Sequence, residues 1–238
     1  MKEIYNLDWK KYNTSVFNSI SHQYFPKEEL NPSPGMLVGP LLELEGEKII
    51  YVPIAKNAST SITNSLNFTP IKIPLQLDCP FLIDIPEKYR SGYKFFVVTR
   101  NPKERWISGI NEFLTIYDDQ GVDFHGDGKG YYNKFLMELK NNKFIFDGHT
   151  EPQVSIMRFC FKYDLDITFL KLDENLNEKI SSILKRKVII NHDNISEKFE
   201  FKLENYKFCH DILTKYCMKN KNFLDLYEMD FYLYNHSS

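Results

Sequence analysis

The segment 53–61, PIAKNASTS, joins a lysine and three hydroxyl side chains to the end of a strand-like run. A helix that begins near Ser59 would direct unpaired backbone N–H groups, and the positive end of its dipole, at whatever precedes it. Lys56 adds a full positive charge, and Thr60 and Ser61 add further hydroxyl donors. These groups together suit a phosphate or a sulfate. The open alternative is an ordinary strand-to-helix turn in which Ser59 caps the helix and Lys56 faces solvent.

This loop does not match the phosphate loop of ATP- and GTP-dependent enzymes. That motif needs glycines and places its lysine directly before a serine or threonine of the helix. Here Lys56 precedes Ser59 by three residues, and the segment 53–61 contains no glycine. The pattern therefore disfavours a nucleoside triphosphate as the ligand.

A second candidate anion site follows the continuous apolar run 93–99. Arg100 lies at the end of this expected buried strand, where an unpaired guanidinium would be costly, and its planar fork of donors suits a phosphate. Ser108 follows eight residues later, on a helix that Asn101 is expected to cap and Pro102 to begin. The expected polar face of this helix holds Ser108 together with Glu104, Asn111 and Thr115. Taken alone, Ser108 is typical of a solvated serine.

Strands and helices alternate around these two loops. We expect strands at 36–39, 48–53, 93–99 and 166–172. We expect helices at 59–66, from 102 onward, at 131–141, near 152, and at 173–184, 204–219 and 222–234. This alternation predicts an α/β fold with a central, mostly parallel sheet flanked by helices. Ligands of such sheets sit beyond the carboxyl ends of the strands, so the two loops would share one crevice if their strands are neighbours.

Composition limits the classes of function. The 238 residues carry a net charge of −2, which argues against a nucleic-acid partner. The N-terminus lacks the apolar stretch of a signal peptide, and no run of about 18 apolar residues occurs, so we expect a cytoplasmic chain without membrane insertion. The four cysteines match no zinc-binding spacing, so we expect reduced, buried thiols and no metal. A turn-rich break divides the chain into an N-terminal extension, 1–35, and a single α/β domain, 36–238.

The two loops together resemble the donor-binding motifs of sulfotransferases that use 3′-phosphoadenosine 5′-phosphosulfate (PAPS). PIAKNASTS resembles the 5′-phosphosulfate loop of that family, and VVTRNPKERWIS, residues 97–108, resembles its 3′-phosphate motif. Three further segments extend the resemblance: DGHTEPQ at 147–153, YDLDITFLKLDENL at 163–176 and LYEMDFYLY at 226–234. The resemblance is closest to the carbohydrate sulfotransferases of the chondroitin, dermatan, HNK-1 and heparan 2-O type.

The resemblance implies a P-loop-like domain that transfers a sulfuryl group from PAPS to a hydroxyl of a carbohydrate or similar acceptor. The product would be adenosine 3′,5′-bisphosphate (PAP). The resemblance further implies that Arg100 and Ser108 bind the 3′-phosphate, with Arg105 either a lesser candidate or a structural ion-pairing residue. The 5′-phosphosulfate would bind the first loop, where Lys56 would also be catalytic. The residues of that loop are Lys56, Asn57, Ala58, Ser59, Thr60 and Ser61.

The identity of the general base that removes the acceptor's proton stays open. His149 matches the histidine of the family's D-x-H-x-x-P segment and is our first candidate. The alternatives are Glu151, His125 and the acids between 78 and 87. The heparan 2-O type has a base histidine between its two anion loops, whereas this chain has no histidine between 57 and 99.

Two other classes of function are compatible with the sequence. An ATP-dependent kinase with a P-loop-like fold is disfavoured by the missing glycines and by the lack of a magnesium-binding carboxylate just after a strand. A non-catalytic protein that binds a nucleotide or a sulfated glycan would keep the same two loops. The presence of Lys56 together with Arg100 and Ser108 favours a functional donor-binding site.

Overall fold

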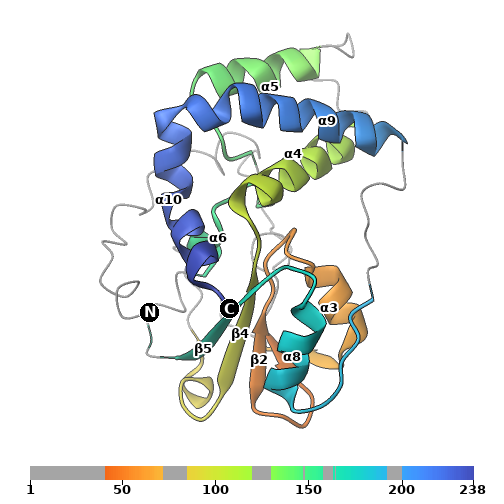
Figure 1. Cartoon of the computed structure of the whole chain (residues 1–238), viewed down its shortest axis with the longest axis vertical. Helices are drawn as coiled ribbons and strands as arrows, with labels where there is room; N and C mark the ends of the chain where they lie inside the picture. Colours follow the sequence, from red (N-terminus) through yellow and green to blue (C-terminus); the bar gives the residue numbers. More distant parts are fainter. Residues whose placement is uncertain are drawn as a thin grey trace, which may run out of the picture.

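The computed structural model describes residues 41–71, 85–119, 130–146, 148–157, 163, 165–191 and 200–238. The expected N-terminal extension, the expected strand at 36–39 and the segment 120–129 lie outside the described residues. Within those residues the chain forms an α/β structure, a five-stranded mixed sheet with helices on both faces (Figure 1).

The five strands run in the order β3-β1-β2-β4-β5. As expected, β2 (Ile49–Val52), β4 (Lys94–Thr99) and β5 (Asp166–Lys171) run parallel to one another. The sequence does not predict β1 (Leu42–Leu44) or β3 (Phe68–Pro70), and each pairs antiparallel. The sheet is therefore mixed rather than mostly parallel. Each of these two strands has only three residues, which is too short for a periodic pattern to be recognised.

Helices bury both faces of the sheet. One face is covered by α3 (Ser59–Ser65) and α8 (Leu176–Leu184). The other is covered by α6 (Gln153–Ile156) and by the C-terminal half of α10 (Lys221–His236). The first face buries Tyr51, Ile62, Phe96, Val98 and Ile180, and the second buries Val52, Phe95, Val97, Val154 and Met229. Successive residues of β4 thus point to opposite buried faces, which explains its unbroken apolar run.

A third hydrophobic cluster lies between helices, above the carboxyl end of β4 (Figure 1). It is formed by α4 (Pro102–Asp119), α5 (Gly130–Lys140) and α9 (Glu200–Lys215), together with the N-terminal half of α10. A short turn, η4 (Cys217–Lys219), joins α9 to α10. This cluster buries Cys209 and Cys217 as free thiols, as expected, whereas the other two cysteines lie outside the described residues.

The start of α4 agrees with the sequence, but its polar face does not. Asn101 Oδ1 accepts a hydrogen bond from the backbone N–H of Lys103 at 3.0 Å, and Pro102 is the first helical residue, as predicted. Ser108 is only 7% exposed and Asn111 only 2%, so the expected solvated face is partly buried. The cause is that the loop after β2 and the segment 148–151 both pack against this side of α4.

The start of α8 and one short turn differ from the sequence prediction. α8 begins at Leu176 rather than at 173, because Asp173 Oδ1 accepts a hydrogen bond from Asn175 N at 3.0 Å and forms a turn. A short 3₁₀ turn, η2 (Glu87–Tyr89), lies where no element is predicted. Among the described residues no helix has the length and apolar character needed to cross a membrane.

Candidate functional site

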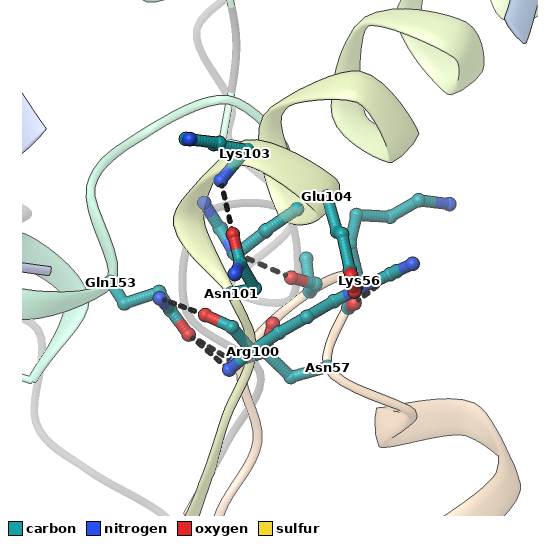
Figure 2. A network of polar contacts seen from close by, with 9 residues as sticks. Lys56, Asn57, Arg100, Asn101, Lys103, Glu104 and Gln153 are labelled. Atoms are coloured by element: carbon teal, nitrogen blue, oxygen red, sulfur yellow. Dashed lines mark hydrogen bonds and ion pairs between the residues drawn. The ribbon is translucent and has the colours of Figure 1, made fainter. Parts of the chain in front are cut away.

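The two candidate anion loops lie side by side at one edge of the sheet. β2 and β4 are hydrogen-bonded neighbours, with Val52 opposite Val97, so both strands deliver the chain to the same edge. Arg100 Nη1 then donates a hydrogen bond to the backbone carbonyl of Lys56 at 2.9 Å, although 44 residues separate them in sequence (Figure 2). The two strands are therefore neighbours, and the loops that follow them are in direct contact.

The first loop turns sharply without a glycine. Lys56 and Ala58 both adopt left-handed backbone conformations, with φ of 68° and 59°. This conformation costs roughly 1–2 kcal/mol in a residue with a Cβ. Ala58 is the N-cap of α3, so Ser59 is not the capping residue that the simple-turn alternative requires. As an alanine, this N-cap residue supplies no side-chain hydrogen bond to the first turn of α3.

The three hydroxyl residues of α3 differ in their exposure. Thr60 is exposed and Ser59 is half-buried, whereas Ser61 is only 6% exposed. The hydroxyls of Ser59 and Thr60 are thus accessible to a ligand in front of the loop. Ser61 lies on the side of α3 that faces the interior.

Asn57 stabilises the conformation of the first loop. It is fully buried, and its backbone N–H donates to the carbonyl of Ile54 at 3.1 Å. Its side-chain Nδ2 donates to the carbonyl of Val98 at 2.7 Å and to Oε1 of Gln153 at 2.6 Å. All of its N–H groups are therefore engaged within the protein, so Asn57 holds the loop in place rather than offering a donor outward.

Each of the two loop cations has a carboxylate of α4 beside it. Lys56 Nζ lies 3.2 Å from Glu112 Oε2, with the side chains 21% and 32% exposed. Arg100 Nε lies 3.7 Å from Glu104 Oε2. Both pairs are partly exposed to solvent, where such ion pairs contribute about 0–1 kcal/mol. An incoming anion can therefore compete for both cations at small cost.

From α4, the buried Arg105 side chain holds two other segments, the first loop and 148–151. Its side chain is 1% exposed, and its Nε donates to the carbonyl of Ala55 at 3.1 Å. Nη2 donates to the carbonyl of Gly148 at 3.3 Å, and Nη1 donates to that of Glu151. The burial fits a structural role for Arg105 better than a place in a phosphate site, and the contacts shown are hydrogen bonds to backbone carbonyls rather than the expected ion pair.

Ser108 lies on the same face of α4 as two residues that contact the first loop. Arg105 and Glu112 stand three positions before it and four after it, which places all three on one side of a helix. Both neighbours reach the first loop, through Ala55 and Lys56. Ser108 is 7% exposed and therefore sits beneath the loops rather than on an open surface.

His149 lies beside this arrangement, on the turn that precedes α6. A Cβ added to Gly109 would stand 2.8 Å from the carbonyl carbon of His149, so glycine is needed where α4 meets this turn. His149 itself is half-buried, whereas Glu151 is only 7% exposed. Tyr227 of α10 fixes the same turn, because its hydroxyl donates to the carbonyl of Thr150.

Of the remaining base candidates, Glu87 is the one among the described residues. His125, Asp78 and Asp84 lie outside the described residues. Glu87 lies in η2, which leads into the amino end of β4, whereas Arg100 follows its carboxyl end. Among the described candidates, His149 and Glu151 are therefore the two that accompany the anion loops.

The sequence does not reveal the roles of two buried residues, one that contacts both loops and one that holds it in place. The side-chain amide of Gln153 contacts Asn57 and Arg100 (Figure 2). The Asp230 carboxylate accepts hydrogen bonds from the backbone N–H groups of Gln153 and Val154, at 2.7 and 2.9 Å. Burial raises the pKa of Asp230 above its ordinary value. Both residues belong to segments of the sequence that carry the family resemblance, but only the contacts reveal what they do.

The groups gathered here suit an anion. They comprise a lysine, an arginine, accessible hydroxyls and an uncapped helix start. Among the described residues no group of three or more histidine, cysteine, aspartate or glutamate side chains could hold a metal ion. No family model, curated protein or solved structure matches this chain. The chemistry of the two loops is therefore the basis for a functional proposal.

Proposed function

We propose that the protein is a PAPS-dependent sulfotransferase with a P-loop-like domain, acting on a hydroxyl of a carbohydrate or similar acceptor. One observation carries the proposal: the two loops that resemble the donor-binding motifs of that family contact each other directly. Arg100 donates a hydrogen bond to the Lys56 carbonyl at 2.9 Å, at the carboxyl ends of adjacent parallel strands. A donor that is anionic at both its 5′ and its 3′ position suits two anion loops that lie side by side.

The residues present fit such a donor by their chemistry. Lys56 and the uncapped start of α3 offer a cation and backbone N–H donors for the 5′-phosphosulfate. Arg100 offers a planar fork of donors for the 3′-phosphate, and Ser108 offers a hydroxyl. When bound, PAPS would supply the activated sulfuryl group, and PAP would be the product.

The residues of the first loop divide into two roles in this proposal. Lys56 neutralises the negative charge that develops on the leaving phosphate oxygens, which is the interaction most specific to the transition state. Ser59 and Thr60 donate from their accessible hydroxyls. Asn57, Ala58 and Ser61 fix the path of the loop. Before the donor binds, Glu112 pairs with the lysine, so the donor must displace or share that contact.

His149 is the residue that we propose as general base. It is half-buried and lies on the turn that packs against α4 next to Ser108, so its ring is nearer to solvent than the Glu151 side chain. We expect His149→Asn to lower the turnover rate by about a hundredfold or more. The affinity for PAP should stay within about threefold. A large rate loss in Glu151→Gln with normal turnover in His149→Asn would transfer the role to Glu151.

Calorimetric titration of PAP and ATP tests the donor site. We expect micromolar or tighter binding of PAP and weaker binding of ATP, because the first loop lacks the glycines of an ATP loop. Arg100→Ala should abolish PAP binding, whereas Lys103→Ala, at an exposed lysine in the first turn of α4, should leave it intact. ATP binding equal to or tighter than PAP binding would refute the donor and favour the kinase alternative.

Sulfuryl transfer from PAPS to a panel of hydroxyl-bearing carbohydrates tests turnover. Lys56→Ala should abolish transfer while leaving the melting temperature within a few degrees, because its ion pair with Glu112 is partly exposed. Lys103→Ala is again the matched control. Tight PAP binding without transfer to any acceptor of a broad panel would favour the non-catalytic alternative.

A further inference from the structure

One side chain contacts both anion loops at once. Gln153 Oε1 accepts a hydrogen bond from Asn57 Nδ2 at 2.6 Å and another from the backbone N–H of Arg100 at 2.9 Å. Its Nε2 donates to the backbone carbonyl of Arg100 at 2.9 Å. Figure 2 shows the amide facing the backbone of Arg100, with Asn57 below it. A single planar amide therefore holds the first loop through a side chain and the second through its main chain.

The position of this amide is itself fixed from the other side. Pro152 precedes it as the N-cap of α6, and the two N–H groups that begin this short helix donate to one carboxylate of α10. That carboxylate, Asp230, is 1% exposed, and Gln153 is fully buried. The Gln153 backbone therefore cannot shift without breaking contacts to α10, and the amide acts as a fixed point for both loops.

The shared oxygen atom has a geometric consequence. Because Asn57 and Arg100 donate to the same atom, one acceptor fixes the Asn57 side chain against the Arg100 backbone, and it acts together with the hydrogen bond from Arg100 to the Lys56 carbonyl. Few side chains can replace it, since the position needs an acceptor for two donors and a donor for the Arg100 carbonyl in one plane. Hydrogen bonding within the sheet ends before this point, as β2 stops at Val52 and β4 at Thr99.

We propose that Gln153 is a positioning residue that, together with the Arg100–Lys56 hydrogen bond, sets the separation of the two anion loops. Through this residue the two loops act as a single site for a ligand with two phosphates. The inference rests on the proposed donor, because only a ligand that is anionic at both ends bridges the loops. A ligand with one phosphate needs one loop and is indifferent to the separation. The signature of Gln153 is therefore a selective effect on the bridging ligand.

The experiment compares PAP with adenosine 5′-monophosphate and adenosine 3′-monophosphate by calorimetry. Gln153→Met keeps the length of the side chain and removes its amide. We expect it to weaken PAP binding about ten- to thirtyfold, and to change the affinity of each monophosphate by less than about threefold. Tyr227→Phe is the matched control, because it removes a buried hydrogen bond to Thr150 without touching either loop. The control should leave the ratio of PAP to monophosphate affinity unchanged.

An equal loss of affinity for all three nucleotides in Gln153→Met, or an unchanged affinity for every one of them, would overturn the positioning role. Failure of the wild type to bind PAP would refute the donor instead. Gln153 would then be judged by amide hydrogen exchange in the segments 54–61 and 99–103. Faster exchange in Gln153→Met, confined to these two segments and absent from Tyr227→Phe, supports positioning. Exchange equal to that of the control overturns it.

Discussion

The variant Arg105→Met tests whether Arg105 is a structural residue or a ligand-binding residue. The substitution keeps a long aliphatic side chain but removes every N–H donor from a position that is 1% exposed. Three backbone carbonyls then lose their donor, those of Ala55, Gly148 and Glu151. We expect a large loss of stability together with an almost normal PAP site.

The magnitude follows from the number and kind of these contacts. A hydrogen bond to a charged group contributes about 1.5–3 kcal/mol, and breaking a buried charged network costs about 3–5 kcal/mol in total. The contact to Gly148 is the longest at 3.3 Å, so we expect about 4 kcal/mol for the whole set. A chain of this length loses roughly 2–4 °C per kcal/mol, so the melting temperature should fall by roughly 8–16 °C.

Differential scanning calorimetry measures the melting temperature, and titration well below it measures PAP affinity, which should stay within about threefold. Arg105→Lys should lose about half as much stability, because an ammonium cannot reproduce the fork that serves three carbonyls. Arg100→Met is the matched control, with the opposite outcome expected: a small change in melting temperature and loss of PAP binding. An Arg105→Met variant that melts within about 2 °C of wild type but no longer binds PAP would refute the reasoning.

Variants at three further positions and one pH series test other contacts. Glu112→Gln should tighten PAP binding about two- to fivefold at low salt, since the carboxylate no longer competes for Lys56, and unchanged affinity would contradict that competition. Gly109→Ala should lower the free energy of unfolding by about 2 kcal/mol or more in urea, because the methyl group meets a backbone carbonyl, and a normal midpoint would disprove this close contact. Ala58→Gly should be tolerated whereas Ala58→Val should destabilise by about 1–2 kcal/mol, and equal stabilities would argue against the left-handed conformation. Burial raises the pKa of Asp230, so the carboxyl group of the folded chain binds a proton more tightly than that of the unfolded chain. The protonated Asp230 therefore stabilises the folded chain below about pH 4, and this stabilisation falls as the pH rises toward the raised pKa. Asp230→Asn should flatten that slope in denaturant titrations, and an unaltered slope would assign it to other groups.

The parts of the site that follow local rules could be predicted from the sequence. An N-capping asparagine before a proline marks the start of α4, a continuous apolar run marks β4, and a mainly apolar segment marks β5. Parallel strands end at the same edge, so their loops could be expected to meet. These features depend on residues that are close in sequence or on a general property of parallel sheets.

The parts that depend on tertiary packing could not be predicted. Arg105 donates hydrogen bonds to backbone carbonyls, and because every residue has such a carbonyl, the sequence does not show which ones accept these bonds. Glu112 meets Lys56 only because of the way α4 packs over the first loop. Asn57 resembles a ligand-binding residue in sequence, yet its donors turn inward because Val98 and Gln153 lie within reach. The same packing buries Ser108, which periodicity alone assigns to a solvated face.

The glycine-free turn at Lys56 and Ala58 has a consequence for the thermodynamics of binding. Residues with a Cβ sample fewer backbone conformations than glycine, so this loop has little conformational entropy to lose when an anion arrives. Contacts to Arg100 and Gln153 restrict it further before any ligand is present. Anion binding should therefore order little of the chain. Its heat should reflect charge neutralisation and released water rather than the freezing of a flexible loop.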